Sequence, residues 1–115
     1  QSTNDAFPSA IHIATVTTLD NLIMAMEIMR DSFIQKSVEF DGIVKMGRTH
    51  LQDAVPVRLG QEFGAYAAVV ARDIARVKKA QQAMLQINIG ATAIGTGLNA
   101  DPEYMKLAVE NILKK

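Results

Sequence analysis

The sequence predicts an all-α protein built from long antiparallel helices, and three observations support this prediction. The stretch from about residue 8 to 38 contains no glycine and no proline after Pro8, and it is rich in Ala, Met, Leu and Ile. The stretch from about residue 59 to 87 repeats apolar residues at the three-to-four spacing of one helix face. No part of the 115-residue chain shows a strand pattern that competes with these helical signals.

The first predicted helix covers about residues 8 to 38, and Pro8 suits its first turn. Four residues at helical spacing mark its main apolar face: Leu22, Met26, Met29 and Phe33. Leu19 and Ile23 widen this face, and other apolar residues lie outside it. A helix with apolar residues on several sides is usually buried on several sides.

The second predicted helix covers about residues 59 to 87 and carries a seam typical of a coiled coil. The seam consists of Phe63, Ala67, Val70, Ile74, Val77 and Met84, with Gln81 as a polar interruption. The third predicted helix covers about residues 101 to 114, with Asp101 as its N-cap and Pro102 at its first position.

Helix length indicates that more protein surrounds this chain. At about 1.5 Å per residue each long helix spans roughly 45 Å. A compact domain of this length has a radius of gyration of only about 13 Å. We therefore expect an elongated bundle, completed by material outside the chain, of which residues 1–115 are an internal segment.

Three loops, at residues 1–5, 41–57 and 88–100, are rich in small hydrogen-bonding residues. The second is longer than the roughly 2–8 residues that join neighbouring helices. The third contains Gly90, Gly95 and Gly97, but a phosphate-binding P-loop is disfavoured because Thr96 stands where that motif has lysine. The loops are therefore candidates for function.

Single residues in these loops have simpler explanations. Residues 2–5 form a typical helix N-cap cluster. His50 in the loop 41–57 suits a structural hydrogen bond as well as catalysis. His12 lies between two isoleucines in the first helix, which favours a satisfied core histidine.

Composition excludes several functional classes. Twelve basic residues balance twelve acidic ones, so neither nucleic acid nor an anionic membrane is an expected partner. The chain has no cysteine and two histidines, and we expect no metal site and no cofactor. It shows no signal peptide and no apolar stretch near the ~20 residues of a membrane span, so we expect a cytoplasmic protein.

Three segments together resemble one family closely. They are QSTNDAFPSAIHIA, KMGRTHLQDAVPVRLGQEFGAY and INIGATAIGTGLNADPEY, and in this order they resemble the aspartase/fumarase superfamily over almost the whole chain. Ser2-Thr3-Asn4 and Gly90-Ala91-Thr92 are more similar to the aspartate ammonia-lyases, because fumarases tend to have Ser-Ser-Asn and Gly-Gly-Thr there. The resemblance implies part of the superfamily's central helical domain.

The resemblance also implies a reaction, the reversible elimination of ammonia from L-aspartate to give fumarate. Ser2 and Thr3 would bind the carboxylate that becomes the aci form. Asn4, Thr49 and His50 would hold the amino group, and His50 would also assist proton movement. The family's base, a serine on a Gly-Ser-Ser loop, is absent from these residues. We therefore expect the isolated chain to be inactive.

Helix length also predicts how the site is assembled. In an antiparallel hairpin of the two long helices, Ser2, Thr3 and Asn4 lie roughly 45 Å from Thr49 and His50. Because these residues must meet one small substrate, we expect a homotetramer with sites shared between subunits. Two alternatives stay open: a class II fumarase segment, and a non-catalytic helical module for oligomerisation.

Overall fold

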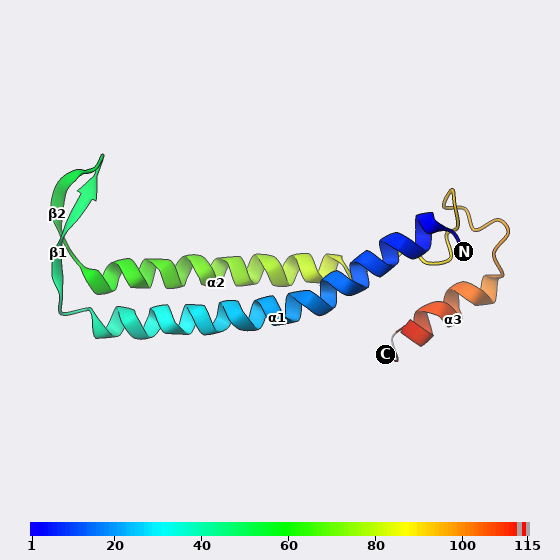
Figure 1. Ribbon diagram of the computed structural model, residues 1–115, viewed down its shortest axis with the longest axis horizontal. Helices are drawn as coiled ribbons and strands as arrows, with labels where there is room; N and C mark the ends of the chain where they lie inside the picture. The colour runs from blue at the N-terminus through cyan, green and yellow to red at the C-terminus, as the bar shows by residue number, and fades with distance from the viewer. Residues whose placement is uncertain (113, 115) are drawn as a thin grey trace. The chain divides into compact units, whose positions relative to one another are not determined.

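The computed structural model describes residues 1–112 and 114, which form two compact units. The hairpin unit comprises Asn21–Lys78, and the terminal unit comprises Gln1–Asp20 with the described part of Lys79–Lys115. The elements in chain order are α1 (Thr3–Glu39), β1 (Val44–Thr49), β2 (Gln52–Arg58), α2 (Leu59–Ala83) and α3 (Pro102–Ile112) (Figure 1). The predicted, mainly helical fold class is confirmed.

The first helix begins at Thr3, five residues before the predicted start at residue 8. Ser2 is its N-cap, because the Ser2 Oγ accepts the N–H of Asn4 at 3.2 Å. In return, the Asp5 carboxylate accepts the N–H of Ser2 at 2.7 Å. This reciprocal pair is a capping box, and it extends the helix to the N-terminal side of Pro8.

The predicted loop at residues 41–57 is instead a two-stranded antiparallel β-hairpin, which corrects the expectation that the chain has no strands. Thr49 pairs with Gln52, so only His50 and Leu51 form the turn. Both turn residues have positive φ angles, 51° and 60°. A two-residue turn of type I′ requires this conformation and usually contains Asn-Gly. The dipeptide His50-Leu51 does not predict a turn of this type.

A bulge interrupts the hairpin ladder between Met46 and Arg48. Gly47 occupies the bulge, and a Cβ atom there would lie 2.7 Å from the carbonyl oxygen of Val55. The extra residue therefore requires glycine, because any side chain would collide with the opposite strand.

The core of the hairpin unit lies between α1 and α2, which run side by side there (Figure 1). Ile23, Val70 and Ile74 are buried, and Met26, Phe33 and Val77 pack against them. The predicted seam of α2 is confirmed at Ala67, Val70 and Ile74. On α1, however, Leu22 and Met29 are 46% and 44% exposed, so the buried face centres on Ile23 instead.

Aromatic and charged residues fix the end of this unit that carries the hairpin. Four aromatic rings form a cluster with centroids 5.2–6.1 Å apart: Phe33, Phe40, Phe63 and Tyr66. Lys45 of β1 contacts Glu62 of α2 at 2.7 Å, and the N–H of Leu59 donates to the Ile43 carbonyl at 2.8 Å. These contacts hold the hairpin against the start of α2.

The second helix begins at Leu59, as predicted, and ends at Ala83, before the predicted residue 87. Beyond it, the N–H groups of Leu85 and Gln86 donate three residues back, to Gln82 and Ala83. Such tight turns commonly terminate an α-helix.

In α3, Asp101 accepts the N–H of Glu103 at 2.9 Å, which confirms the predicted N-cap. The predicted end of this helix at residue 114 passes through residue 113, which lies outside the described residues. Within residues 1–112 and 114, no helix is both long enough and apolar enough to cross a membrane.

Gly60 lies where α2 starts in close contact with the end of α1, and there is no space for a side chain at this position. A Cβ atom at Gly60 would lie 2.8 Å from Asp41 Cα and would also collide with the Ser37 carbonyl. We expect Gly60→Ala to destabilise the protein by roughly 1–3 kcal/mol, measured by denaturant unfolding.

Gly64→Ala, in the same helix, is the matched control. Its Cβ would meet Ser37 Cβ at an ordinary 3.8 Å. This change should be neutral or stabilising by up to about 1 kcal/mol. Equal effects of the two substitutions would contradict the steric account.

Candidate functional site

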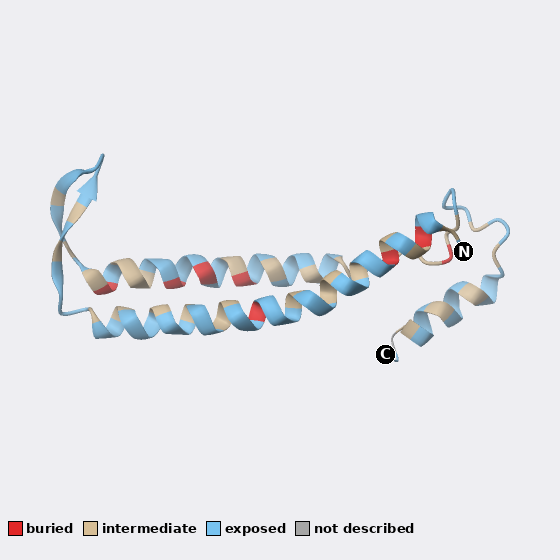
Figure 2. Ribbon diagram, in the orientation of Figure 1, coloured by how far each residue is buried: buried red, intermediate tan, exposed pale blue. Residues whose placement is uncertain are grey.

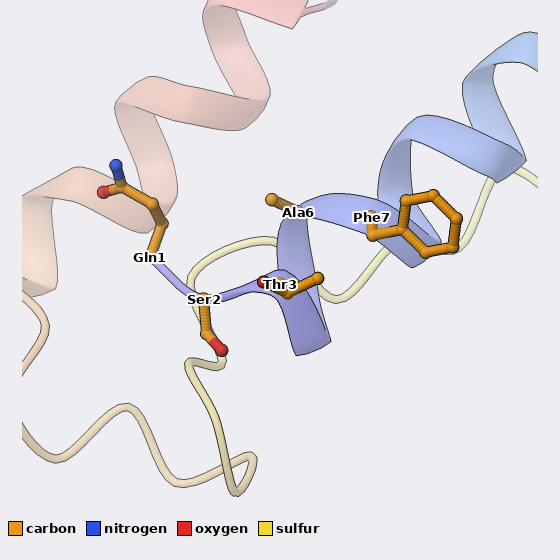
Figure 3. A pocket seen from close by; sticks show the side chains of 5 residues that line it. All are labelled: Gln1, Ser2, Thr3, Ala6 and Phe7. Carbon is orange, nitrogen blue, oxygen red and sulfur yellow. The ribbon is translucent and has the colours of Figure 1, made fainter.

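The first group of candidate residues, Ser2, Thr3 and Asn4, lies at the start of α1 in the terminal unit. Figure 3 shows Ser2 and Thr3 on the wall of a hollow that Gln1, Ala6 and Phe7 also line. Ser2 also borders a second open hollow of about 460 Å³. Gln1 also lines it, and the loop 88–100 contributes the rest of its wall with Thr92, Ala93, Ile94, Thr96, Leu98 and Asn99. The structure thus brings two predicted functional loops together around Ser2.

A buried carboxylate joins these two loops. Asp5 is fully buried, with an exposed fraction of 0%. One of its oxygens accepts the N–H of Ser2, and the other accepts the N–H of Gly90 at 3.1 Å and of Thr92 at 3.0 Å. Asp5 therefore connects the N-terminus of α1 to a loop 85 residues away in the sequence.

These hydrogen bonds lower the pKa of Asp5 below its ordinary value of 3.8. The N–H of Ser2 is the largest cause, and those of Thr92 and Gly90 act in the same direction against the effect of burial. Donors that point at a carboxylate stabilise its charged form. Asp5 is consequently an anion at neutral pH.

Asn4 and Asn88 make a second connection between the loops. Pro8 has no N–H, so it cannot donate to the Asn4 carbonyl as a helix residue normally would. The Asn88 side chain supplies the missing donor at 3.1 Å. The Asn4 side chain in turn donates to the Ala93 carbonyl at 2.8 Å, and this contact orients its amide.

The second group, Thr49 and His50, lies at the tip of the hairpin in the hairpin unit. Both residues are exposed, and His50 has a positive φ angle. Residues other than glycine are uncommon in this conformation, which costs of order 1 kcal/mol or more and is concentrated at functional sites.

The two groups therefore belong to different compact units. His12 is hydrogen-bonded as predicted, since its Nδ1 donates to the Gln86 carbonyl at 2.7 Å, but it is only partly buried and does not belong to a core. Sequence reasoning missed the roles of Asp5, Asn88 and Thr92. Of these three residues, only Asp5 could have been identified from the sequence, because Ser-x-x-Asp before an apolar run fits a variant of the capping box.

The arrangement at the start of α1 suits an anionic ligand. The N-terminus of a helix carries a partial positive charge, and its first N–H groups face outward. The Ser2 Oγ already accepts the N–H of Asn4, so its own proton remains available for donation. Among the described residues, no cluster of three or more acidic or histidine side chains is placed to hold a metal.

Comparison with known proteins shows the family to which the chain belongs. A family described as "Lyase" matches residues 1–114, and the chain belongs to this family. The chain is 60% identical over 112 residues to an aspartate ammonia-lyase from Bacillus subtilis, covering 97% of this chain and 24% of that protein. It thus spans about a quarter of the length of the curated relatives that it matches.

Solved structures share the fold. A fumarate lyase:delta crystallin from Brucella melitensis matches 99% of this chain and 25% of its own, with 39% identity and a TM-score of 0.93. A class II fumarase from Schistosoma mansoni matches 99% of this chain and 25% of its own, with 30% identity and a TM-score of 0.87. The helical arrangement is therefore that of this lyase family.

The lowered pKa of Asp5 predicts a dependence of stability on pH. A carboxyl group whose pKa falls on folding stabilises the protein above its unfolded pKa, near 3.8. That contribution is lost as the pH falls through the lower folded pKa. We expect Asp5→Asn to lower the melting temperature at pH 7, with the difference from wild type shrinking towards pH 3.

Asp31→Asn serves as the control for this experiment, because Asp31 is an exposed carboxylate of α1 outside the network. It should change the melting temperature little at either pH. A difference between Asp5→Asn and wild type that stays constant from pH 7 to pH 3 would contradict the assigned charge state.

Proposed function

We propose that this chain is part of an aspartate ammonia-lyase, which eliminates ammonia from L-aspartate to give fumarate. The main support is the set of donors at the start of α1, in a chain 60% identical to an aspartate ammonia-lyase. The relative's name states its reaction, and a site for a dicarboxylate fits the donors that Ser2, Thr3 and the helix terminus provide.

The chemistry requires stabilisation of negative charge. A base removes a proton from the carbon beside the side-chain carboxylate, and the electron pair of that bond moves into the carboxylate to form a doubly charged aci-carboxylate. When this collapses, the carbon–carbon double bond forms, and the carbon–nitrogen bond breaks with its electron pair leaving on ammonia. Fixed donors that point at the developing charge lower the barrier most.

The proposed roles of the side chains are those that the family resemblance implies. Ser2 and Thr3 donate to the carboxylate that becomes the aci form. Asn4 donates its amide N–H to Ala93, which leaves its Oδ1 to accept from the substrate ammonium. Thr49 and His50 contact the same ammonium, and His50 assists proton movement.

The base itself lies outside this chain in the proposal. By family resemblance it is a serine on a Gly-Ser-Ser loop, followed by a lysine and an asparagine that bind the other carboxylate. Residues 1–115 contain no such segment. The chain therefore contributes part of the central helical-bundle domain and part of the site in an enzyme that we expect to be cytoplasmic.

Ultraviolet absorbance of fumarate tests the proposed reaction. The full-length protein, given L-aspartate, should produce fumarate, and an equal concentration of L-malate should give much less. Fumarate from malate alone would favour the fumarase alternative, which the shared fold with a class II fumarase supports. Fumarate from neither substrate would reject catalysis and favour the helical module.

We further propose a homotetramer whose sites are shared between subunits. Thr3 opens α1, whereas Thr49 follows only after all 37 residues of that helix. Both groups must touch one four-carbon substrate, so they must come from different copies of the chain. The exposed apolar residues of α1, such as Met24 and Ile28, suit the packing of helices between subunits.

Complementation tests the shared site. Subunits of the full-length protein with Ser2→Ala and Thr3→Val are mixed, after dissociation, with subunits carrying His50→Ala. Each parent should be nearly inactive, and hybrids should regain activity because some sites combine two unmutated halves. Verified hybrids that stay as inactive as their parents would remove the support for sharing.

A further inference from the structure

We propose that Asp5 is a positioning residue that acts through Ser2. Its buried carboxylate holds the Ser2 backbone and the loop 90–92 in one geometry, so that the Ser2 hydroxyl meets the substrate carboxylate in a fixed direction. This inference rests on the proposed function, and it adds a residue that does not itself touch the substrate.

The geometry separates Asp5 from the substrate. Asp5 has no exposed surface, and its oxygens are occupied by the N–H groups of Ser2, Gly90 and Thr92. An anion would also repel an anionic substrate if the two met. Asp5 therefore influences the reaction only through the groups that it holds.

The link from Asp5 to the Ser2 hydroxyl is short. The contact of 2.7 Å between the Ser2 nitrogen and Asp5 Oδ1 fixes the Ser2 backbone. The contact of 3.2 Å between the Asn4 nitrogen and Ser2 Oγ then fixes the hydroxyl. Because the oxygen accepts this N–H, the hydroxyl keeps its own proton for donation to a ligand.

In the loop 88–100, Asp5 also holds Thr92 in an unfavourable backbone conformation. Thr92 has a φ of 67°, which a β-branched residue rarely adopts. Its N–H is one of the three donors to Asp5, so the hydrogen bond offsets the backbone strain. Thr92 and Ser2 line the same hollow. Loss of the Asp5 carboxylate would therefore free the backbone of both residues at once.

A double-mutant cycle in the full-length protein tests this role. Asp5→Asn keeps the shape of the side chain but replaces one acceptor oxygen by a donor, which faces an N–H group. We expect it to lower kcat for aspartate about 10- to 100-fold. The KM should change by less than about threefold, because the lost interaction belongs mainly to the transition state.

The decisive measurement is the same change in a Ser2→Ala background. Asp5→Asn should then lower kcat by less than about twofold further, because the hydroxyl that Asp5 positions is already absent. If the losses of kcat from Asp5→Asn and Ser2→Ala multiply in the double variant, the positioning role of Asp5 is rejected. If Asp5→Asn does not fold, Asp5→Ser, which keeps a short acceptor near the Ser2 N–H, replaces it in the cycle.

His12→Ala is the matched control, since it removes another link between α1 and the segment after α2 without touching Ser2. It should lower the melting temperature and leave kcat within about twofold of wild type. An equal loss of kcat in His12→Ala would reduce the role of Asp5 to general stability. A wild-type protein without aspartate elimination would instead reject the proposed function, and the role of Asp5 with it.

Discussion

The carboxylate of Asp5 is the interaction on which the terminal unit depends. A fully buried anion requires hydrogen-bond donors, and the chain supplies three backbone N–H groups from two segments far apart in the sequence. Satisfying that one charge caps α1, closes the loop 88–100 over its start and brings Ser2 to the edge of a hollow.

In the hairpin unit, by contrast, the helices bury little of their apolar surface. Within the described residues, only four apolar side chains are buried: Ile23, Ala67, Val70 and Ile74. Figure 2 shows most of α1 and α2 as exposed. Side chains such as Met24, Ile28 and Val38 are 57–74% exposed, and exposed apolar surface of this extent marks packing against other protein.

Backbone strain occurs at one candidate residue and at one residue of the loop that contacts Asp5. His50 has a φ of 51° at the tip of the hairpin, and Thr92 has a φ of 67° in the loop that Asp5 holds. Neither position uses glycine, although glycine would remove the strain. The side chains at these two positions are therefore maintained at an energetic cost. In the reaction that we propose, such a cost is reasonable where it fixes the direction of a hydrogen-bond donor.

The sequence by itself determined the helical class, the start of α2 at Leu59 and the N-cap of α3 at Asp101, because periodicity and capping are local properties. It also predicted that His12 is hydrogen-bonded, but not that its partner is Gln86. Only the tertiary structure decided that residues 44–58 form a hairpin, since its turn at His50 and Leu51 is imposed by strand pairing against residue preference. It also decided the role of Asp5, because a carboxylate at a helix start has the same local pattern whether or not a distant loop donates to it. Contacts across 85 residues depend on packing, which no local pattern contains.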